Sequence, residues 1–137
     1  MKITGSCHCG AIHYEAEVDP ATVGVCHCTD CQILTGTAFR VFIRAAPGTF
    51  RITSGTPRIY IKTADSGSKR EQAFCEHCGS PLYASSVGGP EPRLYSLRAG
   101  TIHQRDQLRI AHQIWMRSRS PWLGQLAGTP EHETQPA

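Results

Sequence analysis

The residues of this 137-residue chain best suited to chemistry are its seven cysteines, which fall in three tight clusters. The clusters are Cys7-x-Cys9, Cys26-x-Cys28-x2-Cys31 and Cys75-x2-Cys78. Buried, inert cysteines would have no reason to gather in this way, so the clustering favours metal binding or catalysis. An odd count also leaves one thiol over in any scheme of paired disulfides. The pattern indicates zinc, which proteins bind through thiolates at such short spacings.

A structural zinc is held by four protein ligands in a tetrahedron, so seven cysteines divide naturally into four and three. The first and third clusters are short pairs, one from each half of the chain. Each pair is followed by a glycine, Gly10 or Gly79, which lets the backbone turn tightly beneath a metal. Such a zinc would join the two halves and stabilise a small domain. The predicted ligands of this structural zinc are Cys7, Cys9, Cys75 and Cys78.

The second cluster offers three thiols to a metal that takes four ligands. Three protein ligands with one open position are typical of a catalytic zinc, so Cys26, Cys28 and Cys31 are predicted to hold one. The alternative is that a histidine, His103 or His112, closes this site from elsewhere in the fold. His27 is a poor candidate, because in extended chain it points away from its two cysteine neighbours.

The charge of this second site indicates what fills the open position. Zinc with three thiolates carries a formal charge of −1, which suits a substrate thiol better than a carbonyl that needs polarising. A fourth thiolate would raise the negative charge and require nearby N–H groups or cations. The loop amides around Gly36, His27, Lys69 or an arginine of the basic segment 93–119 could supply them.

The elements that must position these cysteines are predicted to be short β-strands. Apolar and polar residues alternate over six stretches, and clusters rich in Gly, Pro, Ser and Asp separate them. The stretches are residues 11–18, 39–44, 50–53, 58–62, 71–75 and 93–99. Residues 29–36 could form one helical turn capped by Thr29 or Asp30. We therefore predict one mainly β domain over residues 1–123, built from antiparallel sheets, and a flexible tail over 124–137, which lacks an apolar pattern.

The composition excludes few partners. The net charge is +3, too small to define a partner, although residues 93–119 contain six arginines and one acid, Asp106. No stretch approaches the ~20 apolar residues of a membrane span. The first ten residues also lack the apolar core of a secretory signal, so we expect a cytoplasmic protein that does not bind membranes.

Three stretches together resemble a known family: "GSCHCGAIHYE" (5–15), "CHCTDCQILTGTAF" (26–39) and "FCEHCGSPLY" (74–83). They are similar to the glutathione-dependent formaldehyde-activating enzymes, a family that includes centromere protein V. The segment "HQIWMRSRSPW" (112–122) resembles the family's closing segment, so the resemblance spans roughly residues 3–122.

The resemblance implies a small zinc fold of several twisted antiparallel sheets, similar to methionine sulfoxide reductase B. It implies two zinc ions per chain, one structural and one at the three-cysteine cluster. The implied reaction is reversible addition of glutathione to formaldehyde, a carbon–sulfur lyase reaction in the reverse sense. The ligands it implies are those predicted above from the spacing.

Two classes of function follow from these observations. The first is a zinc-dependent carbon–sulfur lyase that joins glutathione or another small thiol to formaldehyde or a related aldehyde. Its thiol pocket would be lined by the loop from residue 32 to 38, and arginines would meet the substrate carboxylates. The second is a non-catalytic zinc-stabilised module with a basic face for nucleic acid or a protein partner. No ladder of stacking aromatics accompanies the arginines, so nucleic acid is not expected. The residues predicted for the glutathione pocket are Gln32, Thr35, Gly36 and Thr37.

Overall fold

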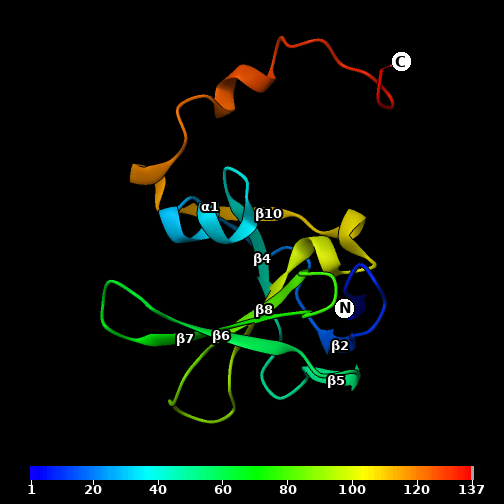
Figure 1. Cartoon of the computed structure of the whole chain (residues 1–137), viewed down its shortest axis with the longest axis vertical. Helices are drawn as coiled ribbons and strands as arrows, with labels where there is room; N and C mark the ends of the chain where they lie inside the picture. The colour runs from blue at the N-terminus through cyan, green and yellow to red at the C-terminus, as the bar shows by residue number, and fades with distance from the viewer. Residues whose placement is uncertain (137) are drawn as a thin grey trace.

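The computed structural model describes residues 1–136 and contains two β-sheets (Figure 1). A three-stranded sheet has the order β1-β2-β5, and a seven-stranded sheet has the order β10-β3-β4-β9-β8-β7-β6. The mainly β class is therefore confirmed. The strands are β1 (Lys2–Ser6), β2 (His13–Glu17), β3 (Val23–Cys26), β4 (Arg40–Arg44), β5 (Arg51–Ser54), β6 (Arg58–Thr63), β7 (Lys69–Phe74), β8 (Pro81–Ser86), β9 (Tyr95–Arg98) and β10 (Ile110–Ile114).

All six stretches predicted as strands contain one: β2, β4, β5, β6, β7 and β9. Three of the other four strands lack a half-buried alternation: all four residues of β3 and four consecutive residues of β8 are buried, and all five of β10 are exposed. β1 does alternate, but one of its two buried residues is Gly5, which gives no apolar signal in the sequence. The two sheets are antiparallel throughout except at one place, where β10 pairs with β3 in parallel.

One helix, α1 (Thr29–Thr35), follows β3 directly. Its N-cap is Cys28, whose Sγ accepts a hydrogen bond from the Cys31 backbone N–H at 3.3 Å, so the predicted caps Thr29 and Asp30 were wrong. Gly36 ends the helix with φ 68°, a left-handed conformation that glycine adopts without strain. Single 3₁₀ turns complete the described chain: η1 (Ala99–Thr101), η2 (Arg105–Gln107), η3 (Met116–Ser118) and η4 (Leu123–Leu126).

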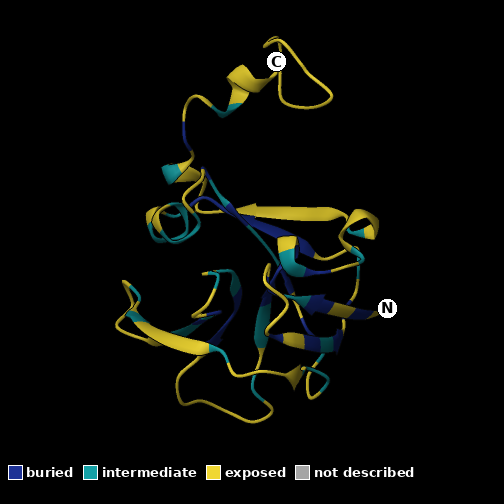
Figure 2. Ribbon diagram, turned by 45° about the vertical axis from the view of Figure 1, so that its right-hand side comes forward, coloured by how far each residue is buried: buried dark blue, intermediate teal, exposed yellow. Residues whose placement is uncertain are grey.

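The hydrophobic core lies between the two sheets. Ile3 and Tyr14 of the small sheet pack with Ile43, Leu82 and Leu97 of the large one, and each is at most 1% exposed. Figure 2 shows this buried centre in dark blue. The strands of the large sheet therefore use one face for the core, and their alternate residues point to the other face.

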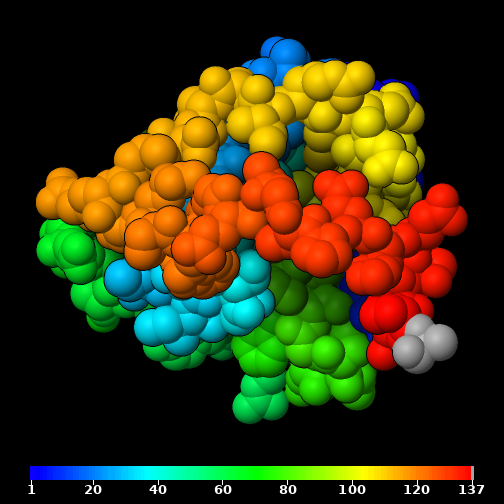
Figure 3. Space-filling view, turned by 90° about the horizontal axis from the view of Figure 1, so that it is seen from above, coloured from blue at the N-terminus to red at the C-terminus, as the bar shows by residue number. Residues whose placement is uncertain are grey.

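The C-terminal segment stands away from this body. Residues 124–136 are all exposed, and in Figures 1 and 2 the segment extends beyond the sheets. Seen from above, it runs across the top of the molecule (Figure 3). The domain boundary at residue 123 and the flexibility of the tail stay predictions. Among the described residues, no helix has the length and apolar character needed to cross a membrane.

The turn after β5 should be sensitive to one added methyl group. Gly55 has φ 77°, and a Cβ there would collide with the backbone carbonyl oxygen of Ala11, in the loop between β1 and β2. Gly67 has φ 85° but nothing within 4 Å of the same position, so it is a matched control. Both alanine substitutions should cost ~1–2 kcal/mol through the left-handed backbone. Gly55→Ala should cost ~1–3 kcal/mol more through the clash, as measured by urea unfolding. Equal losses of unfolding free energy for the two variants would show that the loop containing Ala11 moves aside without a loss of stability.

Candidate metal centres

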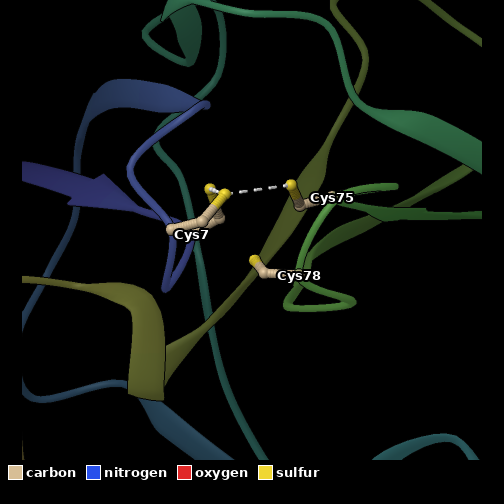
Figure 4. Close-up of side chains that lie close together, drawn as sticks. Cys7, Cys75 and Cys78 are labelled. Carbon is tan, nitrogen blue, oxygen red and sulfur yellow. Dashed lines mark hydrogen bonds between the residues drawn. The ribbon is translucent and has the colours of Figure 1, made fainter.

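The first group of cysteines joins two loops that lie far apart in the sequence. Cys7 and Cys9 follow β1, while Cys75 and Cys78 lie in the turn between β7 and β8, and the four Sγ atoms all lie within 4.8 Å of one another. Figure 4 shows Cys7 of one loop facing Cys75 and Cys78 of the other. The Cys7–Cys9 and Cys9–Cys75 sulfur separations are 3.6 and 3.7 Å. A disulfide requires about 2.05 Å, and all seven cysteines are free thiols.

The geometry of this group fits a tetrahedral zinc. With Zn–S distances of 2.3 Å, the sulfurs of a tetrahedron lie about 3.8 Å apart, close to the separations found here. Hydrogen bonds also support thiolates: the Ile12 N–H donates to Cys7 Sγ at 3.3 Å, and Ser80 Oγ lies 3.2 Å from Cys78 Sγ. The Ser80 hydroxyl lowers the pKa of Cys78 to about 5. The group could therefore hold a metal ion as a closed four-sulfur site.

The second group is assembled within a short stretch of chain. Cys26 ends β3, Cys28 caps α1 and Cys31 lies in its first turn, and the three Sγ atoms lie within 4.8 Å of one another. Arg40 of β4 is the cross-strand partner of Cys26. Hydrogen bonding to Cys26, assisted by the guanidinium of Arg40, lowers the pKa of Cys31 to about 5. The same hydrogen bond and burial raise the pKa of Cys26. These contacts thus favour a thiolate at Cys31.

No histidine or carboxylate of residues 1–136 completes this group. His103 lies at the small sheet, where its Nδ1 and Nε2 contact Thr4 Oγ1 at 2.9 Å and Ser6 Oγ at 3.0 Å. His112 stacks edge-on against Phe42. His27 is buried, and its Nε2 lies 2.8 Å from Gln113 Oε1. The three thiols therefore have no fourth protein ligand among the residues that the structure describes.

A cavity of about 390 Å³ opens beside the three thiols, all of which line it. Its floor is the face of the large sheet that points away from the core. Along β4, the cavity residues Arg40, Phe42 and Arg44 alternate with Val41 and with the fully buried Ile43. The same alternation on the neighbouring strands places Gln72, Ala84 and Ser96 in the floor. Gln72 is the cross-strand partner of Ala84 and Ala84 that of Ser96, so the three form one row across the sheet. Strand periodicity thus separates the core from the cavity.

The cavity is strongly basic. Five cationic side chains line it and no acidic side chain of the described residues does. Burial lowers the pKa of Arg98 to about 9, and the charge of Arg40 acts in the same direction, yet Arg98 stays protonated at neutral pH. Burial also lowers the pKa of Arg70, with Arg44 as the neighbouring charge. The five cationic residues are Arg40, Arg44, Lys62, Arg70 and Arg98.

An aromatic residue stands at the edge of this cavity, directly after β10. Trp115 lines the cavity and has φ 59°, a conformation rare for a bulky residue. The guanidinium of Arg117 lies 5.2 Å from the centre of its ring. A left-handed residue of this type next to three candidate ligands indicates a position held for function.

The residues predicted for the thiol pocket do not line this cavity. The Gln32 amide donates to the carbonyls of His27 and Ser118, and the Thr35 hydroxyl donates to the Cys31 carbonyl. Neither they nor Gly36 and Thr37 line the cavity; from α1 it is Cys31 and Leu34 that do. The predicted cation Lys69 contacts Thr63 instead. The polar side chains of the 32–37 stretch thus donate hydrogen bonds to backbone carbonyls, and these bonds stabilise the helix behind the thiols.

Most of the basic floor was not predicted from the sequence. Of the five cations, only Arg98 lies in the arginine-rich segment singled out above. Two of the others, Arg40 and Arg44, lie in a predicted strand, and Arg70 lies in an observed one. The two-residue period of these strands is enough to place all three on a polar face. Periodicity does not indicate which strands are neighbours, and the cavity exists only because these strands lie side by side.

The comparisons with known proteins agree with this picture. The family model for glutathione-dependent formaldehyde-activating enzymes matches residues 2–118, so the chain belongs to that family. A solved protein of Rhodobacter sphaeroides is similar in fold, with a TM-score of 0.59 at 20% sequence identity. That match covers 80% of this chain and 98% of the other. No curated protein matched the chain. The family is one of formaldehyde-activating enzymes; the similarity to methionine sulfoxide reductase B stays a prediction.

The two cysteine groups should differ in their contribution to stability. Cys75→Ser removes a ligand that joins distant loops, so it should lose a metal and lower Tm by ~10 °C or more. Cys28→Ser affects a group formed within one local stretch and should lower Tm by only a few degrees. Calorimetry together with zinc analysis measures both effects. Equal destabilisation by the two substitutions would contradict the division into a structural and an open site.

Proposed function

We propose that the protein is a zinc-dependent carbon–sulfur lyase of the S-(hydroxymethyl)glutathione synthase type. It joins glutathione or another small thiol to formaldehyde or a related aldehyde, and catalyses the reverse cleavage, in the cytoplasm. The observation that carries this proposal is that three converging thiols, to which residues 1–136 add no fourth ligand, line a basic cavity. Membership of the formaldehyde-activating family supports it.

Two zinc ions per chain are part of the proposal. Cys7, Cys9, Cys75 and Cys78 would hold a structural zinc, and Cys26, Cys28 and Cys31 would hold the catalytic one. The catalytic zinc, when bound, would lower the pKa of a substrate thiol and supply it as a thiolate at neutral pH. A carbonyl compound in the cavity would then form the C–S bond, and the proton released by the thiol would end on the carbonyl oxygen.

The chain's own residues would balance the charge of this reaction. Arg40 contacts Cys31 and so offsets the negative charge of the ligand set. Arginines further along the floor suit the carboxylates of glutathione, because a guanidinium binds a carboxylate through two parallel hydrogen bonds. Trp115 and Ile114 would cover one side of the bound thiol.

The alternative of a basic binding module has less support. The six arginines of residues 93–119 serve different purposes: Arg93 pairs with Glu71 at 2.7 Å, and Arg98 is buried in the cavity. Arg105 and Arg109 donate to backbone carbonyls of their own segment. A nucleic-acid backbone would need such side chains free and exposed along one face.

Replacement of zinc by cobalt tests the open position. The sulfur-to-cobalt charge-transfer absorption should grow when glutathione is added, because a fourth thiolate joins three. S-Methyl glutathione is the matched control and should give no change, since its sulfur cannot ionise. A charge-transfer absorption that stays unchanged at every glutathione concentration, or that changes equally with the S-methyl compound, would contradict thiol binding at this metal.

A further inference from the structure

The floor of the cavity carries more positive charge than thiol addition to formaldehyde requires. Of its five cations, Lys62 is paired with Asp30 at 2.8 Å, across from β6 to α1. None of the four arginines has a carboxylate partner within the described residues. A zinc with three thiolates would offset only one of these charges. The cavity is therefore built for anionic groups that the ligand must bring.

Two of these arginines are prepared for an anion close to the thiols. Arg40 is 4% exposed and Arg98 is 8% exposed, and the Nε atom of each is buried without a hydrogen-bond partner. Arg98 otherwise donates to Gln72 Oε1 at 2.6 Å, and Arg40 contacts Cys31. Burial of a charged donor without a hydrogen-bond partner costs free energy, and two such donors close together cost more. The Nε atoms are covered, but both side chains line the cavity, where their terminal N–H groups can reach a bound anion that offsets the two buried charges.

The position of this pair indicates which reactant carries the anion. Arg40 is the cross-strand neighbour of Cys26, and Arg98 is opposite Phe42 on the same sheet face. An anion held here lies beside the sulfurs, next to the carbon that the thiol attacks. The carboxylates of glutathione are separated from its sulfur by several bonds, and formaldehyde has no charge. A carboxylate bonded directly to the reacting carbonyl carbon fits this position.

We propose that Arg40 and Arg98 bind the carboxylate of the carbonyl reactant, and that the preferred carbonyl substrate is a 2-oxo acid. This inference rests on the proposed function of thiol addition at the same cavity. With glyoxylate, the thiol sulfur forms a bond to the aldehyde carbon and the π electrons of the carbonyl move to its oxygen. That oxygen takes the proton lost by the thiol, so the product is a 2-hydroxy-2-thio acid and no oxidant is needed.

Kinetics with a thiol that has no carboxylate test the proposal directly. With 2-mercaptoethanol and the zinc-loaded protein, kcat/KM for glyoxylate should exceed that for formaldehyde about tenfold or more. Arg40→Gln and Arg98→Gln should each lower kcat/KM for glyoxylate roughly 10- to 100-fold, the loss typical of a hydrogen bond to a charged group. The ratio of kcat/KM for glyoxylate to kcat/KM for formaldehyde should therefore fall about tenfold in both variants, whatever change the lost charge causes in formaldehyde turnover. Arg109→Gln, which changes an exposed arginine outside the cavity, is the control and should change neither value.

Binding without any thiol gives a second measurement that does not depend on activity. Wild-type protein titrated calorimetrically with pyruvate should bind it, whereas acetone, its neutral counterpart, should not bind. Arg98→Gln should raise the Kd for pyruvate about tenfold or more. The comparison of pyruvate with acetone needs no variant, so it holds even where a buried substitution prevents folding.

The other outcomes separate the two proposals. Turnover of formaldehyde with no preference for glyoxylate, and pyruvate binding that the arginine variants do not weaken, would overturn this inference but leave the proposed function. Dependence on Arg40 and Arg98 with glutathione but not with 2-mercaptoethanol would overturn it too, because the carboxylate would then be the thiol's own. Catalysis of thiol addition to neither carbonyl would contradict the proposed function itself.

Discussion

Alternation along the β-strands is the constraint on which the site depends. Because successive side chains of a strand point to opposite faces, one register sends Ile43 and Leu97 into the core and Arg44 and Arg98 into the cavity. A shift of one residue would bury arginines in the core and expose its apolar residues, so the core fixes the register. The energy of apolar burial therefore also holds the arginines of the floor in place, with the three thiols at the end of the same sheet.

Charge balance links these thiols to that floor. Thiolates close together repel one another, and buried arginines close together do as well, but the two sets lie next to each other. Arg40 links the two sets, because it is the cross-strand partner of Cys26 and contacts Cys31. The four-sulfur group has a different environment, with Ser80 and a backbone N–H as its donors and without an arginine among the contacts described above. One cysteine group thus has the surroundings of a structural site, and the other those of a site that binds an anionic ligand.

The sequence predicted the parts of this arrangement that depend on local pattern. The two cysteine groups follow from spacing, and the strands with half-buried alternation follow from periodicity, as β2 illustrates. The parallel pairing of β10 with β3 could not be predicted, because it joins residues 87 or 88 positions apart and neither strand alternates. The basic floor was missed for the same reason: Arg70 and Arg98 are 28 positions apart in sequence, and only the order of β7, β8 and β9 brings them together. The stretch around Gln32 was expected to line the pocket, but its side chains satisfy backbone groups of their own neighbourhood.

The most direct measurement of the central claim, an open metal site facing the basic cavity, is a crystal structure of the zinc-loaded protein with anomalous maps at the zinc edge. The account predicts one zinc enclosed by the four sulfurs of Cys7, Cys9, Cys75 and Cys78. It predicts a second zinc bound by Cys26, Cys28 and Cys31, with a water on the cavity side that a substrate sulfur replaces after soaking. A side chain in that fourth position, or a three-cysteine cluster that stays empty of metal while the other is filled, would contradict it.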